Sequence, residues 1–210
     1  PSNADDLIGG YDGNDSIDAS GGDDTIIGSY GNDTLLGGLG HDSLDGGTGA
    51  DSLLGGDGND TLTAEGSDTL DGGAADDLLL VGSDQAYTLR GGAGYDTVAI
   101  TSGVWYTGSF SLAANGIEQI EGNAQEILGT AGNDSINFTG VTLMAVAFVD
   151  GADGNDVLTG NAAANTLRGG LGNDTLVGGA GNDLLDDSSS TGADSLRGGD
   201  GNDTLVGGKG

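Results

Sequence analysis

The chain has 210 residues, of which 46 are Gly, 34 are Asp or Glu and only 4 are Lys or Arg, so its formal net charge is −30. This charge argues against binding to nucleic acid or to anionic membranes, and the absence of Cys excludes disulfides and thiolate-bound zinc. So many glycines and like charges also oppose collapse of the chain. We therefore expect folding to require a cation that the sequence itself does not supply.

A nine-residue repeat, G-G-x-G-x-D-x-U-x with U a large aliphatic residue, runs without a gap over residues 1–63. Its clearest copy is residues 55–63. The eighth position is always Ile or Leu in these copies. The sixth position is always a carboxylate, and its members are Asp6, Asp15, Asp24, Asp33, Asp42, Asp51 and Asp60.

Each repeat combines the chemistry of a metal-binding turn with that of a short strand. The glycines allow a tight turn with positive φ, which brings carbonyl oxygens to one side, and the Asp adds a carboxylate. Hard oxygen ligands with flexible geometry favour Ca²⁺ over a transition metal. The x-U-x tail predicts a strand of about three residues with U pointing inward.

Two repeats return the chain to its starting side, so we expect coils of 18 residues with two strands and two turns, stacked into two parallel sheets. Alternate repeats then share a flank. Neighbouring carboxylates on a flank would be about 4.8 Å apart and would repel unless a cation lay between them. One predicted column is Asp6, Asp24, Asp42, Asp60 and Asp77, and the other is Asp15, Asp33, Asp51 and Asp68.

On these residues the chain resembles the RTX (repeats-in-toxin) family of Ca²⁺-binding parallel β-rolls. The resemblance implies a module of a secreted bacterial protein. Members are typically exported from Gram-negative bacteria by type I secretion, stay unfolded in the cytoplasm and fold outside the cell. They carry the roll beside a lipase, protease, toxin or adhesin part. The expected location is therefore extracellular or on the bacterial cell surface.

The repeat becomes irregular after residue 63. Residues 64–71 drop one turn residue but keep Asp68 in register, and residues 72–80 keep Asp77. The second of these units has Ala75 where Gly is usual, which predicts a weaker metal site.

Residues 81–90 have neither a glycine pair nor an Asp at the sixth place, and we interpret them as a half-coil without metal. The pattern returns in residues 91–99 with Asp96. We assign residues 1–99 to a first roll block.

Residues 100–149 differ in composition and are interpreted as an irregular β-rich insertion or seam. They contain the only Trp, all three Phe and the only Met. One good repeat, residues 129–137 with Asp134, lies within the segment. The patterns predict strands over residues 104–112, 117–121 and 141–149.

Two interpretations of this segment remain open. Its aromatic residues would either thicken the hydrophobic interior of the roll or form a surface for a ligand or partner, built on Trp105, Tyr106 and Phe110. The second interpretation would fit an adhesin with a cell-surface or glycan partner.

Residues 150–210 form a second roll block, in which Asn165 replaces one Asp and Asp187-Ser188 is a two-residue insertion. The chain stops four residues into a further repeat, so we expect a piece of a longer protein with flanking domains. The remaining predicted metal ligands are Asp156, Asp174, Asp183, Asp194 and Asp203.

No enzymatic activity is expected. The single His41 occupies the variable fifth position of a repeat, which predicts a solvent-facing turn residue, and no nucleophile and base can be paired. The longest apolar run, residues 141–149, is too short to span a membrane.

The sequence thus predicts an all-β parallel β-roll that binds about eleven Ca²⁺ ions and serves as a structural and export-assisting module. The alternatives are an adhesin or surface-layer segment that acts through residues 100–149, and an ice-binding solenoid.

Overall fold

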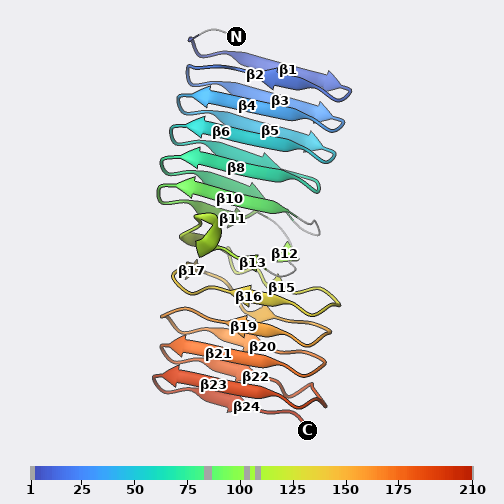
Figure 1. Cartoon of the computed structure of the whole chain (residues 1–210), viewed down its shortest axis with the longest axis vertical. Helices are drawn as coiled ribbons and strands as arrows, with labels where there is room; N and C mark the ends of the chain where they lie inside the picture. The colour runs from blue at the N-terminus through green and yellow to red at the C-terminus, as the bar shows by residue number, and fades with distance from the viewer. Residues whose placement is uncertain (1–2, 83–86, 102–104, 107–109, 210) are drawn as a thin grey trace. The chain divides into compact units, whose positions relative to one another are not determined.

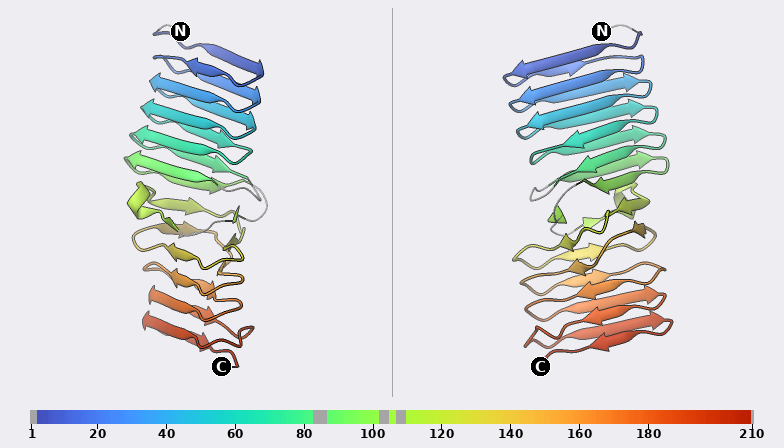
Figure 2. Two further views of the ribbon diagram at one scale, coloured as in Figure 1. Left: turned by 45° about the vertical axis from the view of Figure 1, so that its right-hand side comes forward. Right: turned by 180° about the vertical axis from the view of Figure 1, so that it is seen from behind.

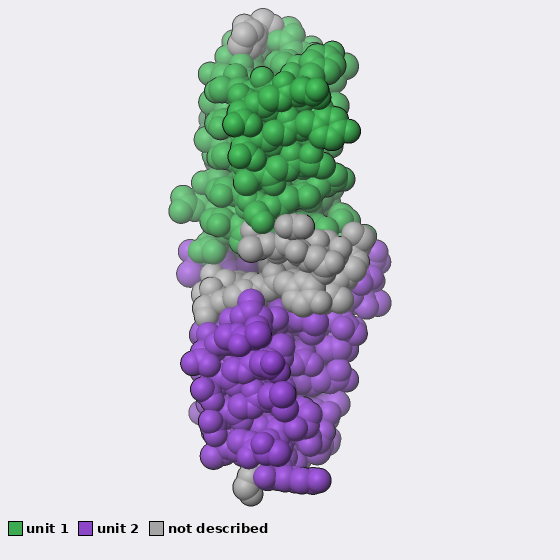
Figure 3. Space-filling model, turned by 90° about the vertical axis from the view of Figure 1, so that its right-hand side faces the viewer, with its two compact units in different colours: residues 1–102, 115–119 green, residues 103–114, 120–210 purple. Residues whose placement is uncertain are grey.

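The computed structural model describes residues 3–82, 87–101, 105–106 and 110–209. The regular structure of these residues is β, apart from one short 3₁₀ helix, η1 (Ala113–Asn115). The chain divides into two compact units, residues 1–102 with 115–119 and residues 103–114 with 120–210 (Figure 3).

The first unit is a parallel β-solenoid in which successive strands alternate between two sheets (Figure 1). In spatial order, the strands of one sheet are β1 (Leu7–Asp12), β3 (Thr25–Tyr30), β5 (Ser43–Thr48), β7 (Thr61–Ala64), β9 (Leu78–Val81) and β11 (Thr97–Ile100). Those of the other are β10 (Thr88–Ala93), β8 (Thr69–Ala74), β6 (Ser52–Asp57), β4 (Thr34–Leu39) and β2 (Ser16–Asp18).

The second unit has the same architecture with shorter strands, as the two views of Figure 2 show. One sheet is β12 (Trp105–Tyr106), β15 (Ile127–Leu128), β18 (Val149–Asp150), β20 (Thr166–Arg168), β22 (Leu184–Asp186) and β24 (Thr204–Val206). The other is β13 (Phe110–Ser111), β16 (Ser135–Asn137), β19 (Val157–Thr159), β21 (Thr175–Ala180) and β23 (Ser195–Asp200). Strand β14 (Gln119–Glu121) neighbours β17 (Thr142–Met144).

The strand pairing confirms the predicted coil of two strands and two turns. Thr25 pairs with Leu7 and with Ser43, a spacing of 18 residues in each direction. The eight-residue unit shortens one coil without loss of register, because Ser52 pairs with Thr69. The prediction of a parallel β-roll is therefore confirmed.

Aliphatic side chains at the eighth position form one buried column in each sheet. Because side chains alternate along a strand and paired strands are in register, this position points inward at every level. In the first unit the columns contain Ile26, Leu44, Leu62, Leu79 and Val98, and Leu35, Leu53, Leu70 and Leu89. In the second they contain Ile127, Val149, Leu167 and Leu185, and Ile136, Leu158 and Leu176.

The predicted strand length of about three residues is wrong for many repeats. Strands such as β3, β4 and β5 have six residues and continue into the glycine pair of the next repeat. The first glycine of the pair, such as Gly28, has no paired residue in this register, since Ile27 pairs with Asp45 and the next pair is Ser29 with Gly47. The turn is thus shorter than the six residues that the repeat suggested.

The predicted strand over residues 104–112 is also wrong, because its described parts form two short strands, β12 and β13, in different sheets. Residues 141–149 likewise form two strands, β17 and β18, since Ala145 between them has a φ of 51° that breaks the extended backbone. The predicted strand over residues 117–121 is shortened to β14.

The aromatic residues of the middle segment are only partly described. Phe138 is fully buried in the second unit. The side chains of Trp105, Tyr106 and Phe110, on which the partner-surface interpretation was built, lie outside the described residues.

Candidate metal sites

The sixth-position carboxylates of the first unit stack in the two predicted columns. In each step, the backbone N–H of one Asp donates a hydrogen bond to Oδ1 of the Asp one coil later, as from Asp24 to Asp42 at 2.8 Å. The first column runs through Asp6, Asp24, Asp42, Asp60, Asp77 and Asp96. The second runs through Asp15, Asp33, Asp51 and Asp68.

The second carboxylate oxygen of most of these residues is buried and has no hydrogen-bond donor. Asp33 and Asp60 are each 2% exposed, and no donor reaches their Oδ2 atoms. A buried charge without a partner is strongly disfavoured, so these oxygens have the chemistry of cation ligands. The predicted ligands with such an Oδ2 are Asp15, Asp24, Asp33, Asp42, Asp51, Asp60, Asp77, Asp96, Asp156, Asp174 and Asp183.

A first-position glycine lies against the carboxylate in most acidic turns, whereas Ala19 holds this place in the repeat of Asp24. A Cβ added to Gly10 would lie 2.6 Å from Oδ2 of Asp15 and 2.9 Å from the carbonyl oxygen of Gly28, one coil later. The carboxylate and that carbonyl therefore converge on space that only a glycine leaves open. Converging carboxylate and carbonyl oxygens are the ligands that Ca²⁺ prefers.

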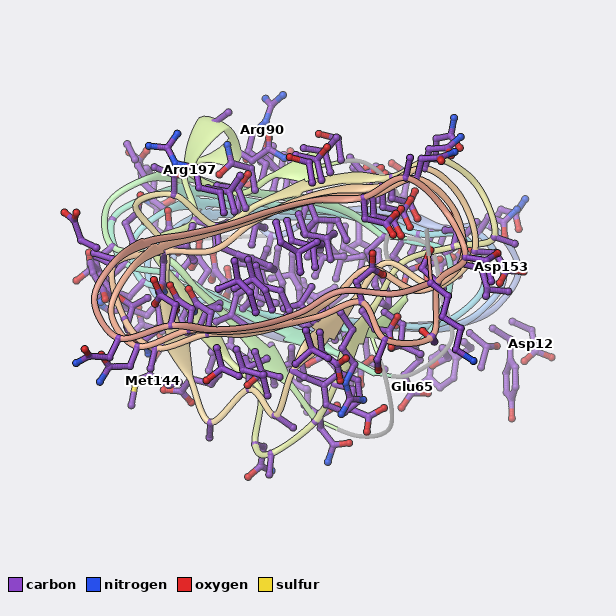
Figure 4. All side chains as sticks on the ribbon, turned by 90° about the horizontal axis from the view of Figure 1, so that it is seen from below. Asp12, Glu65, Arg90, Met144, Asp153 and Arg197 are labelled. Atoms are coloured by element: carbon purple, nitrogen blue, oxygen red, sulfur yellow. The ribbon has the colours of Figure 1, made fainter. Side chains whose placement is uncertain are left out.

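Acidic side chains outside the columns have a different environment. Figure 4 shows the labelled Asp12, Glu65 and Asp153, which are exposed, at the outside of the ribbon, whose centre is filled mainly by carbon atoms. The buried carboxylates without a donor are therefore distinguished from the exposed ones by their position in the repeat.

Burial raises the pKa of some column carboxyls, among them Asp60, Asp77 and Asp156, above their usual value near 3.8. The pKa rises to about 7 for Asp77 and to about 6 for Asp60 and Asp156. Burial is the largest cause; the hydrogen bond from the neighbouring coil opposes it, and neighbouring carboxylates add to it. The stacked carboxylates therefore favour protonation unless a metal ion compensates their charge.

We expect the metal-free chain to become more folded on acidification. A raised folded-state pKa means that the native state binds more protons than the unfolded state, so the stabilisation is fully present below about pH 3.8 and is lost as pH rises through about 6 to 7. The check is circular dichroism of chelator-treated protein from pH 8 down to pH 5, above the pI of about 4.1. Loss of strand signal on acidification would contradict the expectation.

The second unit continues the arrangement, with spacings of 18, 20 or 22 residues. The backbone N–H of Asp134 donates to Oδ1 of Asp156, 22 residues later, and the backbone N–H of Asp156 donates to Oδ1 of Asp174. The chain of hydrogen bonds then runs from Asp174 to Asp194, and on the other flank from Asn165 through Asp183 to Asp203.

Three predicted positions carry side chains whose oxygens are already hydrogen-bonded. The Oδ2 atom of Asp68 accepts from the Gly66 N–H at 3.0 Å, and that of Asp134 accepts from the Thr130 N–H at 2.6 Å. The amide of Asn165 exchanges hydrogen bonds with Asn161. These positions depend less on a cation than the other predicted ligands do.

The fifth position forms a ladder that the sequence did not reveal. Asn, Asp and His side chains at this position accept a hydrogen bond from the backbone N–H of the next coil, in the opposite direction to the Asp columns, as Asn14 does from Asn32. Exposed His41 takes part: its N–H donates to Asp23 at 2.8 Å, and its Nδ1 accepts from Asn59 at 2.8 Å. The recurrence of Asn at this place was the available signal, because its side chain can replace a backbone acceptor.

Sequence reasoning also missed two carboxylates. Glu118 continues the first column beyond Asp96, whose N–H donates to Glu118 Oε2 at 2.9 Å. Asp187, which we had assigned to an insertion, is fully buried. Neither residue stands at the sixth position of a repeat, so the periodic pattern gave no signal for them.

The described chain is thus a parallel β-solenoid whose turns carry stacked oxygen ligands for hard cations. Its sequence matches the family model of the RTX calcium-binding nonapeptide repeat over residues 2–35, 9–44, 27–62, 45–79, 63–85, 150–185 and 188–210. These matches cover more than half of the chain, which belongs to this family and is a calcium-binding structural repeat module. A search of curated proteins found no match.

Among the described residues, no helix has the length and apolar character required to cross a membrane.

Proposed function

We propose that this chain is a structural module of a secreted bacterial protein, and that binding of Ca²⁺ outside the cell drives its folding. The observation that carries the proposal is the series of buried Oδ2 atoms that have no hydrogen-bond donor. In the unfolded chain the same carboxylates are hydrated. Folding therefore replaces the water around these carboxylates by metal, and the free energy of metal binding contributes to the stability of the folded state.

The Ca²⁺ dependence would separate export from folding. Cytoplasmic Ca²⁺ is too low to fill flexible extracellular-type sites, whose dissociation constants are about 10⁻⁴ to 10⁻³ M. The chain would leave the cell unfolded, by type I secretion, and become rigid outside. Its role would be to assist export and then to hold flanking domains of the parent protein, and we propose no catalytic role for it.

The proposed organisation is two roll blocks, residues 1–99 and 150–210, with an irregular segment at residues 100–149 between them. We assign metal binding to the sixth-position carboxylates of the two columns in each block. A cell-surface or glycan partner of the middle segment stays a prediction, because the side chains on which it depends lie outside the described residues.

We expect about eleven Ca²⁺ ions from the pairs predicted in the sequence, and about thirteen when the stacked pairs Asp77 with Asp96 and Asp134 with Asp156 are added. Eleven ions would lower the net charge from −30 to about −8, an ordinary value for a protein surface. Isothermal calorimetry with metal analysis of the dialysed protein measures the number. A stoichiometry below about five would show that the stacked carboxylates are not shared metal ligands.

The control for this measurement is Mg²⁺ at the same concentration. Mg²⁺ requires near-ideal octahedral geometry and gives up its water reluctantly, so it should compete poorly for sites made of carboxylates and carbonyls from two coils. Equal binding of both ions would point to a diffuse ion atmosphere around an acidic chain and would contradict the proposal.

A further inference from the structure

The turn that follows β22 begins with Asp187, whereas the turns that follow β18 and β20 begin with Gly151 and Gly169. The N–H of Gly151 donates to the Arg168 carbonyl, and that of Gly169 donates to the Asp186 carbonyl. This register places Asp187 directly after Gly169 in the stack, at the position where the repeat has glycine. The turn is two residues longer than usual, so Asp187 precedes its sixth-position Asp194 by seven residues.

The inserted residues hold this turn by hydrogen bonds that do not involve the Asp187 carboxylate. Ser188 N–H donates to Asp186 Oδ1 at 3.1 Å, and Ser190 N–H donates to the Asp187 carbonyl at 3.1 Å. The Ser190 hydroxyl, on a residue that is 1% exposed, donates to the Gly172 carbonyl at 2.9 Å. The loop is therefore closed by its own polar groups, which leave the carboxylate directed inward.

The Asp187 carboxylate lies among other carboxylates and has no donor. The residue is 0% exposed, and neither Oδ1 nor Oδ2 receives a hydrogen bond. One oxygen of each of Asp174, Asp187 and Asp194 lies within 4.8 Å of the other two. A Cβ added to Gly169 would lie 2.5 Å from Asp187 Oδ1 and 2.7 Å from Asp174 Oδ2, so both oxygens face the same small space.

No ion pair is found at the three carboxylates among the described residues. The ion pair found among the described residues joins Arg90 to Asp71, in the first unit. Asp194 Oδ1 accepts the Asp174 N–H at 3.0 Å, which holds that carboxylate in place but does not compensate its charge. Three buried or half-buried carboxylates at this separation require a cation more strongly than a pair does.

We propose that Asp174, Asp187 and Asp194 together bind one Ca²⁺ ion, and that this site fills before the other turns of the chain. The inference rests on the proposed function, since it assumes that the columns bind Ca²⁺, and adds a third carboxylate ligand at a non-repeat position. Affinity of Ca²⁺ sites rises with the number of charged ligands and with the rigidity of the site. The number of charged ligands is greater here than in a turn that supplies a glycine carbonyl at the same place.

The test is equilibrium dialysis with a Ca²⁺ buffer series on the full chain and three variants, with bound metal counted at each free concentration. Asp187→Asn removes the charge and keeps the shape. Asp187→Gly restores the glycine of the repeat at this position and keeps the length of the turn. Asp200→Asn is the matched control, because it removes one charge from an exposed side chain of the same unit.

The wild type should retain one ion at a free Ca²⁺ concentration about tenfold below that which fills the other sites. Asp187→Asn and Asp187→Gly should lose this early ion and keep the later binding, whereas Asp200→Asn should keep both. Circular dichroism at saturating Ca²⁺ establishes that each variant is folded.

Two failures are distinguishable. Binding curves of both Asp187 variants that superimpose on the wild type overturn the three-carboxylate site but leave the Ca²⁺ module intact. A wild type that binds no Ca²⁺ overturns the proposed function itself.

Discussion

We expect removal of Ca²⁺ to unfold the chain. As Ca²⁺ returns, the coils that hold Asp174, Asp187 and Asp194 should order first, and the remaining coils should fold in a steep transition at about 10⁻⁴ to 10⁻³ M. Without metal, neighbouring ionised carboxylates about 4.8 Å apart would repel by about 3.5 kcal/mol per pair at an effective dielectric constant of 20. The hydrophobic burial that opposes this repulsion is small, because each coil contributes only one aliphatic residue of the eighth position to each sheet, such as Leu44 to one and Leu53 to the other. Many ions that bind only the folded state add their mass-action terms, which makes the transition cooperative.

Circular dichroism and hydrodynamic radius across a Ca²⁺ titration measure this transition, with Mg²⁺ as the control ion. The unfolded chain of 210 residues should have a radius of gyration of about 50 Å, and the Ca²⁺-bound form should be far more compact. A chelator-treated protein that stays compact and rich in strand at neutral pH would identify a constitutive scaffold and remove the proposed link between folding and export.

Asp33→Ala is expected to weaken Ca²⁺-dependent folding more than Asp6→Ala. Asp33 is 2% exposed and lies between two stacked neighbours: its Oδ1 accepts from the N–H of Asp15, and its own N–H donates to Asp51. It would share one ion with each. Asp6, at the first level of the other column, would share one ion with Asp24. At Ca²⁺ ten times the dissociation constant, each lost ion removes about 1.4 kcal/mol of stability, so the expected losses are about 2.8 and about 1.4 kcal/mol.

The Ca²⁺ midpoint and the steepness of the titration compare the two variants, and Asp12→Ala, at an exposed position, is the control for lost charge. Asp33→Asn separates the two roles of the residue, because it keeps an Oδ1 acceptor for Asp15 and loses the charge. Equal shifts for Asp33→Ala and Asp6→Ala would indicate independent loop sites instead of a stacked column.

The periodic part of the molecule could be predicted from its sequence because every contact there repeats a local pattern. Asp15 and Asp33 meet because each stands at the same place in its repeat, and a coil of 18 residues brings equal places together. The same reasoning predicted that Asp68 stays in register after the shortened unit, and Asp68 accepts a hydrogen bond from the N–H of Asp51. Neither conclusion required knowledge of residues distant in the sequence.

Strand lengths and the middle segment could not be predicted in this way. The continuation of β3 into Gly28 and Ser29 depends on pairing with β5, which the composition of one repeat does not show. The apolar run over residues 141–149 was expected to form one strand. It instead turns at Ala145, because a hydrophobic run does not specify the backbone angle of a single residue.

The sequence by itself determined the repeat, the coil and the acidic columns, since these follow from chemistry that recurs every nine residues. Only the tertiary structure decided which carboxylates outside the repeat join the columns. Glu118 reaches Asp96 across 22 residues, and Asp187 reaches Asp174 and Asp194 through an insertion. Their positions depend on how an irregular turn packs on the coil beneath it, and no period in the sequence encodes that packing.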